Sequence, residues 1–237
     1  MKVMTFLRSS LLAAAASAAL CLAPPTQAGT LIATGYQVPG PLDFNINSPV
    51  RTGSVNAGAF AGTFDAVPIV FWCIQLNEYF SFGTTYNNYT STLQNIPYFD
   101  KLGQLYNEAY AGATNNVTNS AAFQLAVWNI VYDSDSTVDS GLFSATGNTL
   151  ADTNAINQAN TWLAALSGFP DNFDTFWLRS DATTCPAGAQ CENNQDFVTG
   201  VKTSRFDAPE PTPLLLIGAA LVAMMVATRR REGKTQA

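Results

Sequence analysis

The sequence contains no histidine, and charged side chains make up only 12% of its 237 residues. Histidine is the commonest general base and the commonest metal ligand in proteins, so its absence removes both from this chain. A cysteine hydrolase built from this sequence would need a carboxylate as its base. Hydrolytic and metal chemistry of the usual kinds are therefore disfavoured, and we expect neither a cofactor nor a metal.

Basic residues are scarce as well. From residue 29 to residue 208 the chain carries fifteen acidic side chains against five basic ones, which are Arg51, Lys101, Arg179, Lys202 and Arg205. Nucleic-acid-binding domains neutralise phosphates with clustered Lys and Arg. So acidic a segment does not fit that class, and we expect no nucleic-acid partner.

The first 28 residues have the pattern of a secretory signal peptide. Lys2 and Arg8 precede an apolar run over residues 11–22, and small residues lie at the positions expected before cleavage after Ala28. This pattern predicts export from the cytoplasm into a compartment where disulfides form. Residues 29–207 then remain for one domain of ordinary size.

Residues 208–237 carry a Pro-Glu-Pro motif, a short apolar stretch and an arginine cluster, in that order. A single-span anchor with the arginines on the cytoplasmic side is one interpretation. In this order the features also resemble the PEP-CTERM sorting signal of Gram-negative bacteria. The resemblance implies transient anchoring in the inner membrane, processing by an exosortase-type enzyme, and release to the cell surface or extracellular matrix. The motif residues are Pro209, Glu210, Pro211, Arg229, Arg230 and Arg231.

Cysteine is rare, and the predicted mature chain keeps three of the four. Cys185 and Cys191 are separated by a turn-forming Pro-Ala-Gly-Ala-Gln spacer, which lets them close a small disulfide loop after export. Cys73 is left over. It is either a buried, inert thiol or a thiol with a special use.

The middle of the chain predicts an α+β fold. Strand-like runs punctuated by Gly and Pro cover residues 31–38, 44–47, 54–64, 67–76, 173–178 and 197–203, and residues 77–96 suit a hairpin at the sheet edge. Helical spacing covers residues 98–112, a central helix capped by Thr118 or Asn119, and a third helix from Thr153 or Asn154 to Gly168. We expect an antiparallel β-sheet or barrel with a small helical subdomain packed on it.

Two apolar segments each carry one chemically useful side chain. Cys73 lies in Phe-Trp-Cys-Ile at the end of a predicted buried strand, and Gln124 lies in Ala-Ala-Phe-Gln-Leu-Ala-Val-Trp on the central helix. A buried amide must be paired, either by hydrogen bonds or by a covalent bond that removes its nitrogen. A Gln hydrogen-bonded to backbone is therefore one alternative.

These two segments resemble the thioester domains of bacterial surface proteins. By that resemblance, which spans residues 30–205 in outline, Cys73 is the thioester cysteine and Gln124 the acyl donor. The family often has Thr before the Gln and an acidic residue two positions after the Cys, where this chain has Phe123 and Gln75.

The resemblance implies adhesion by covalent capture rather than turnover catalysis. An amine or hydroxyl on an unknown surface target would attack the thioester and become joined to Gln124. We expect Phe71, Trp72, Phe123 and Trp128 to shield the bond from water. Two alternatives remain: a structural extracellular-matrix (biofilm) protein with an unreactive Cys73 and Gln124, and a cysteine hydrolase with a carboxylate base.

Three aspartates follow the central helix: Asp133, Asp135 and Asp139. Asp oxygens are preferred calcium ligands, so these residues are a weak calcium candidate. The stretch does not place a Gly and a closing Glu as an EF-hand loop does. A solvated loop after the helix is the favoured interpretation.

Overall fold

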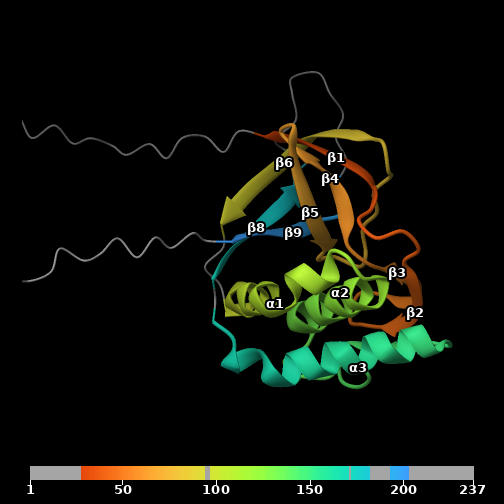
Figure 1. Ribbon diagram of the computed structural model, residues 1–237. Coiled ribbons are helices and arrows are strands. Elements are labelled where there is room, and N and C mark those ends of the chain that lie inside the picture. Colours follow the sequence, from red (N-terminus) through yellow and green to blue (C-terminus); the bar gives the residue numbers. More distant parts are fainter. Residues whose placement is uncertain (1–27, 94–96, 171, 182–192, 203–237) are drawn as a thin grey trace, which may run out of the picture.

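The computed structural model describes residues 28–93, 97–170, 172–181 and 193–202 (Figure 1). The predicted signal peptide up to residue 27, the Cys185–Cys191 loop and the predicted sorting signal over residues 208–237 lie outside the described residues. Among the helices of the described ranges, none is long and apolar enough to cross a membrane.

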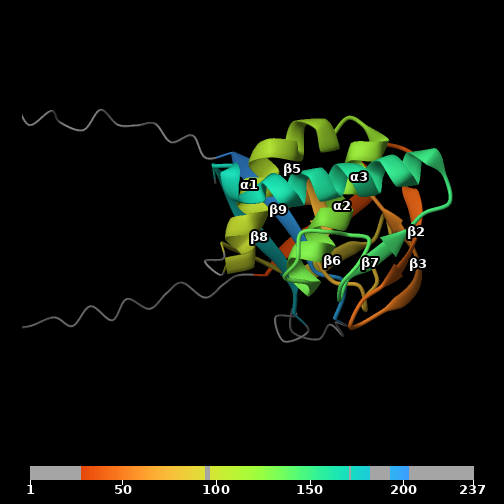
Figure 2. The same cartoon turned by 90° about the horizontal axis from the view of Figure 1, so that it is seen from below.

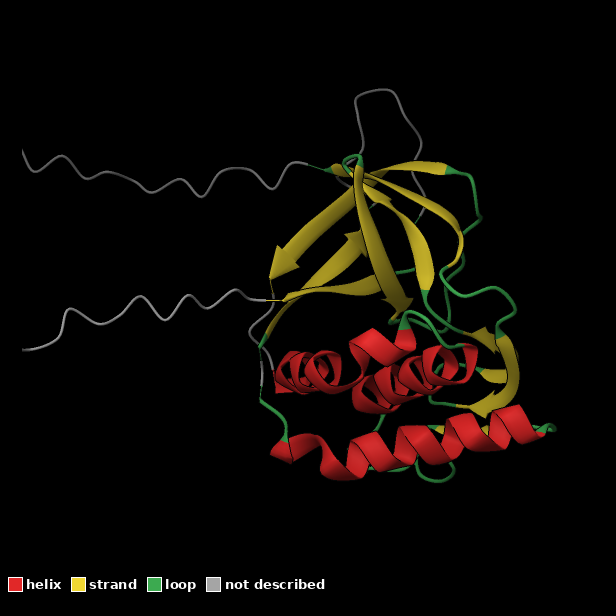
Figure 3. Cartoon of the chain, in the orientation of Figure 1, coloured by secondary structure: helices red, strands yellow, loops and turns green. Residues whose placement is uncertain are grey.

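The larger sheet is a closed barrel of six antiparallel strands in the order β1-β4-β5-β9-β8-β6 (Figure 3). Its strands are β1 (Gly29–Tyr36), β4 (Phe60–Phe64), β5 (Val67–Cys73), β6 (Thr85–Leu93), β8 (Phe173–Ser180) and β9 (Phe197–Lys202). A second, three-stranded sheet has the order β3-β2-β7, with β2 (Leu42–Asn47), β3 (Thr52–Ala57) and β7 (Ser144–Thr146). The predicted α+β barrel with a helical part is confirmed.

Three helices lie together below one end of the barrel (Figures 1 and 3). They are α1 (Pro97–Ala113), α2 (Val117–Tyr132) and α3 (Leu150–Ala165), the last continued by a 3₁₀ turn over Leu166–Gly168. The second sheet lies beside this layer (Figure 2). Helix α2 packs against α1, α3, β5 and the second sheet, and its residues 120–130 are all buried. An apolar helix so enclosed can hold a polar side chain only if that side chain is paired.

Several element boundaries differ from the sequence-based predictions. The run over residues 54–64 is not one strand, because the chain leaves β3 at Ala57 and enters β4 of the other sheet at Phe60. Of residues 77–93, the described part of the predicted hairpin, only Thr85–Leu93 form a strand, β6, which pairs with β1 and β8 in the wall of the closed barrel rather than at a sheet edge. Strand β7 was not predicted, because three residues carry too little alternation to be recognised.

The predicted cap of the central helix and the predicted start of the third helix were also wrong. Asn116 caps α2 by accepting the backbone N–H of Asn119 at 3.0 Å. Thr149 caps α3 in a capping box with Asp152. Asn and Thr are good caps wherever they occur, so a sequence with several of them near one helix start does not identify the cap by composition alone.

Candidate functional site around Cys73

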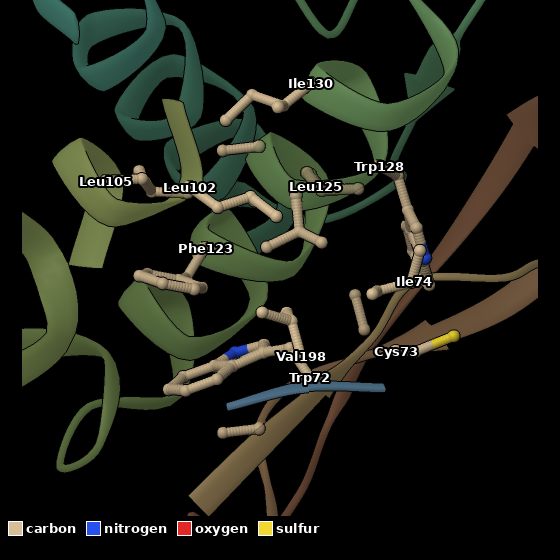
Figure 4. Packing of buried hydrophobic residues seen from close by; sticks show 14 of the residues in the cluster. Trp72, Cys73, Ile74, Leu102, Leu105, Phe123, Leu125, Trp128, Ile130 and Val198 are labelled. Atoms are coloured by element: carbon tan, nitrogen blue, oxygen red, sulfur yellow. The ribbon is translucent and has the colours of Figure 1, made fainter. Parts of the chain in front are cut away.

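Strand β5 ends at Cys73, next to helix α2. The ring of Trp72 lies 4.2 Å from that of Phe123 on α2, whereas the ring of Phe71 lies 4.9 Å from that of Phe197 on β9. Successive side chains of a strand point to opposite faces. The Cys73 sulfur and the Trp72 indole accordingly lie on opposite sides of the strand (Figure 4).

The Gln124 side chain is bonded to the backbone of Cys73. Its Oε1 accepts the N–H of Cys73 at 3.0 Å, and its Nε2 donates to the carbonyl oxygen of Cys73 at 2.8 Å. Gln124 is 1% exposed, and its amide bonds to β5 as the backbone of a neighbouring strand would. The structure therefore brings the two predicted thioester residues together. It does so in the state that the alternative describes, a buried Gln bonded to backbone.

The Cys73 thiol has its own partners. Its Sγ donates to the carbonyl oxygen of Gln75 at 2.6 Å, and Gln195 Nε2 donates to the sulfur. Burial raises the pKa of the thiol well above its usual value. The indole N–H of Trp128 lacks a hydrogen-bond acceptor among the described residues. It lies near the sulfur and lowers the pKa of the thiol, because it favours the thiolate. At rest the thiol is protonated.

The four aromatic residues expected to shield the bond are all buried, but they lie in different places. Trp72 and Phe123 form the helix side of β5, and Phe71 packs inside the barrel. Trp128 packs against Phe143 and also lines a pocket. Water is thus kept from the Gln124 side of the site, and the Trp128 side is the approach to the sulfur.

This pocket has a volume of about 350 Å³ and reaches Cys73. Aromatic side chains line much of it, together with Arg51 and Glu78. Arg51 is already engaged, since its guanidinium donates to Tyr79 Oη at 3.0 Å and to Ser54 O at 3.2 Å. Burial raises the pKa of Glu78. The pocket has room for a small nucleophile beside the sulfur.

Residues 195 and 196 complete the site, and the sequence analysis missed both. The carboxylate of Asp196 accepts hydrogen bonds from the backbone N–H of Ser180 at 2.8 Å and from Trp177 Nε1 at 3.0 Å. The backbone N–H of Asp196 donates to Gln75 Oε1 at 2.9 Å. The register of β5 against β9 pairs Cys73 with Phe197 and so sets this segment beside the thiol. No local pattern marks these residues, and only the register between strands could have found them.

Asp196 gives a testable pH dependence. Burial raises its pKa from 3.8 to about 6, against the opposing bonds from Ser180 and Trp177. The folded protein therefore binds this proton more tightly than the unfolded chain, and ionisation between about pH 4 and about pH 6 lowers stability. We expect Asp196→Asn to remove this decline. Urea unfolding of both proteins across that range measures it, and equal slopes for wild type and variant would contradict the assignment.

The aspartates after α2 shape a loop. Desolvation raises the pKa of Asp133, but hydrogen bonds from backbone N–H groups, including those of Phe143 and Ser134, outweigh it. The pKa of Asp133 therefore lies below its usual value. Asp135 Oδ1 accepts Asn129 Nδ2 at 3.0 Å, and Asp139 is exposed. Within the described ranges, no three or more Cys, Asp or Glu side chains gather closely enough to hold a metal ion.

Comparison of the chain with protein-family models, curated proteins and solved structures finds no significant match. The resemblance to thioester domains therefore rests on the two short sequence segments around Cys73 and Gln124.

Proposed function

We propose that Cys73 and Gln124 form an internal thioester and that the protein uses it to attach covalently to an amine or hydroxyl on a surface target. The observation that carries the proposal is the pairing of the buried Gln124 amide with the backbone of Cys73, at 3.0 and 2.8 Å. This pairing holds an acyl group against the one residue of β5 that has a nucleophilic side chain.

The bond forms by exchange of sulfur for nitrogen. The Cys73 sulfur attacks the Gln124 amide carbon, the C–N bond breaks, and the thiol proton leaves on ammonia. Rotation about the Cα–Cβ bond of Cys73 moves the sulfur from Gln75 O towards the amide. The N–H of Cys73, 3.0 Å from Gln124 Oε1, supplies the hydrogen bond that polarises the carbonyl.

Burial has opposite effects on the two stages of this reaction. It raises the pKa of the Cys73 thiol, so thiolate is scarce and bond formation is slow. The thioester itself is uncharged, and the enclosure of Gln124 within α2 protects it from hydrolysis. A slow self-processing step followed by a stable bond suits a protein that matures once after export.

In the capture step the Cys73 sulfur is the leaving group instead of the nucleophile. A nucleophile in the pocket attacks the thioester carbon, the C–S bond breaks, and the sulfur leaves and takes up a proton. The target is then joined to Gln124 by an amide or ester, and the protein reacts only once. The predicted signal peptide and sorting signal support a proposed site of reaction at the surface or in the matrix of a Gram-negative bacterium.

One observation favours a second candidate, an unreactive structural protein of the extracellular matrix. Both polar atoms of the Gln124 amide are already satisfied by the backbone of Cys73. Such a Gln stabilises the junction of β5 and α2 without any reaction.

Intact mass of the purified mature protein separates the two candidates. For a thioester we expect wild type to be lighter by one ammonia and to gain one methylamine on treatment, and Cys73→Ala and Gln124→Met to do neither. Peptide mapping should place the link at Gln124, and Gln195→Met, the matched control, should still lose ammonia at the end point. A full calculated mass, apart from the hydrogens of a Cys185–Cys191 disulfide, would leave the structural candidate.

A further inference from the structure

Gln195 is the second glutamine at the Cys73 thiol. Its backbone is fixed on both sides, because Tyr89 Oη donates to its carbonyl oxygen at 2.7 Å and its N–H donates to Tyr79 O at 3.3 Å. Its side chain is thereby directed at the sulfur, to which Nε2 donates. The contact is built by the fold and does not depend on a free surface side chain.

The orientation of the Gln195 amide follows from its other bond. Nε2 also donates to the carbonyl oxygen of Gln75 at 2.7 Å, which an amide oxygen in that place could not do. An amide nitrogen has two hydrogens and accepts no hydrogen bond. One hydrogen is bonded to Gln75, and the other is left for the sulfur of Cys73.

We propose that Gln195 is the hydrogen-bond donor that stabilises the Cys73 thiolate. As a thiolate the sulfur loses the bond that it donates to Gln75 O, so it depends on donors that face it. Gln195 is in contact already, and Trp128 has an indole N–H without an acceptor within the described part of the chain. Hydrogen bonds to charged groups are stronger than neutral ones.

This role matters twice in the reaction proposed above, on which its functional meaning rests. Gln195 stabilises the sulfur as it attacks Gln124, and again as it leaves when a nucleophile breaks the C–S bond. It therefore acts as a catalytic residue in contact with the reacting sulfur. Both steps should slow without it, although the end points stay the same.

The test uses the rate at which iodoacetamide alkylates Cys73, measured against pH. All proteins carry Gln124→Met, so that none can form the thioester and the thiol is free. We expect Gln195→Met to lower the alkylation rate about ten- to a hundred-fold at fixed pH. The midpoint of the rate-against-pH profile should move to higher pH. Gln195→Glu, which has the same shape but no donor once ionised, should be slower still.

Gln75→Leu is the matched control. It removes the bond from Asp196 N to the Gln75 side chain but keeps the Gln75 carbonyl oxygen and the contact of Gln195 with the sulfur. Its alkylation rate should equal that of the parent. Equal rates for the parent and both Gln195 variants, or an equal loss in Gln75→Leu, would overturn the inference.

The two proposals can fail separately. If wild type retains its ammonia while the Gln195 variants alkylate more slowly, the thioester is absent and the thiolate role of Gln195 stands. If wild type loses ammonia while alkylation is unchanged in those variants, the thioester stands and the Gln195 role is excluded. Urea unfolding of each variant confirms that the rates compare folded proteins.

Discussion

Replacing Trp72 by alanine is expected to lower the free energy of unfolding by about 3–5 kcal/mol. The side chain is fully buried, and its ring lies 4.2 Å from Phe123, 5.5 Å from Tyr106 and 6.0 Å from Tyr110. It therefore packs β5 of the barrel against α1 and α2 of the helix layer. Removing it leaves a cavity that three aromatic rings cannot fill by small movements. Urea unfolding measures the loss.

Two further substitutions sharpen that measurement. Leu93 is 60% exposed, so Leu93→Ala should change stability by less than about 0.5 kcal/mol. Trp72→Phe should cost much less than Trp72→Ala, because Trp72 Nε1 is a buried donor without a partner in the described residues and its removal is no loss. A cost for Trp72→Ala no greater than that of Leu93→Ala would show that the barrel and helices do not depend on this contact.

The second large effect is expected for Gln124→Met. Methionine has a similar length but bonds neither the N–H nor the carbonyl oxygen of Cys73, so two buried backbone groups lose their partner. Each such group costs about 1–3 kcal/mol, which gives a loss of about 2–6 kcal/mol in unfolding free energy. Faster amide hydrogen exchange at Cys73 should accompany the loss. A smaller cost with unchanged exchange would mean that water replaces the amide.

The same substitution in a Cys73→Ala background isolates the covalent bond. In that background no thioester forms, and Gln124→Met removes only hydrogen bonds. In wild type that has formed the thioester the amide nitrogen has already left, so Gln124→Met removes the hydrogen bond from Cys73 N–H and a cross-link between residues 51 positions apart, which restricts the unfolded chain by up to about 4 kcal/mol. The cost in wild type should therefore exceed the cost in Cys73→Ala for a thioester and equal it for the structural candidate.

The sequence predicted the elements that carry the site, because their signals are local. The apolar run that ends at Cys73 gave strand β5, and apolar spacing around Gln124 gave a buried helix. Their approach was expected from the resemblance alone, since neither periodicity specifies which strand a helix covers. The barrel order and the short strand β7 depend on pairing between distant segments, which local pattern does not contain.

The least predictable part of the site is the position of Gln195 beside the Cys73 sulfur. Gln195 lies 122 positions from Cys73 and meets its sulfur only because β9 pairs with β5 in one particular register. A shift of one residue would turn Gln195 away from the thiol. The donor to the Gln124 side-chain oxygen was equally hidden, because it is the backbone N–H of Cys73 itself.

The place of β9 in the barrel has a mechanical consequence. The strand lies between β5 and β8 and is antiparallel to both, and the chain continues beyond Lys202 to the predicted sorting signal. If the chain beyond Lys202 is held while Gln124 is joined to a target, tension runs along β9. That tension loads the β5–β9 and β8–β9 hydrogen bonds in shear, so that they bear the force together instead of breaking one after another. The barrel would then resist mechanical unfolding when the protein is pulled between its C-terminal end and its target.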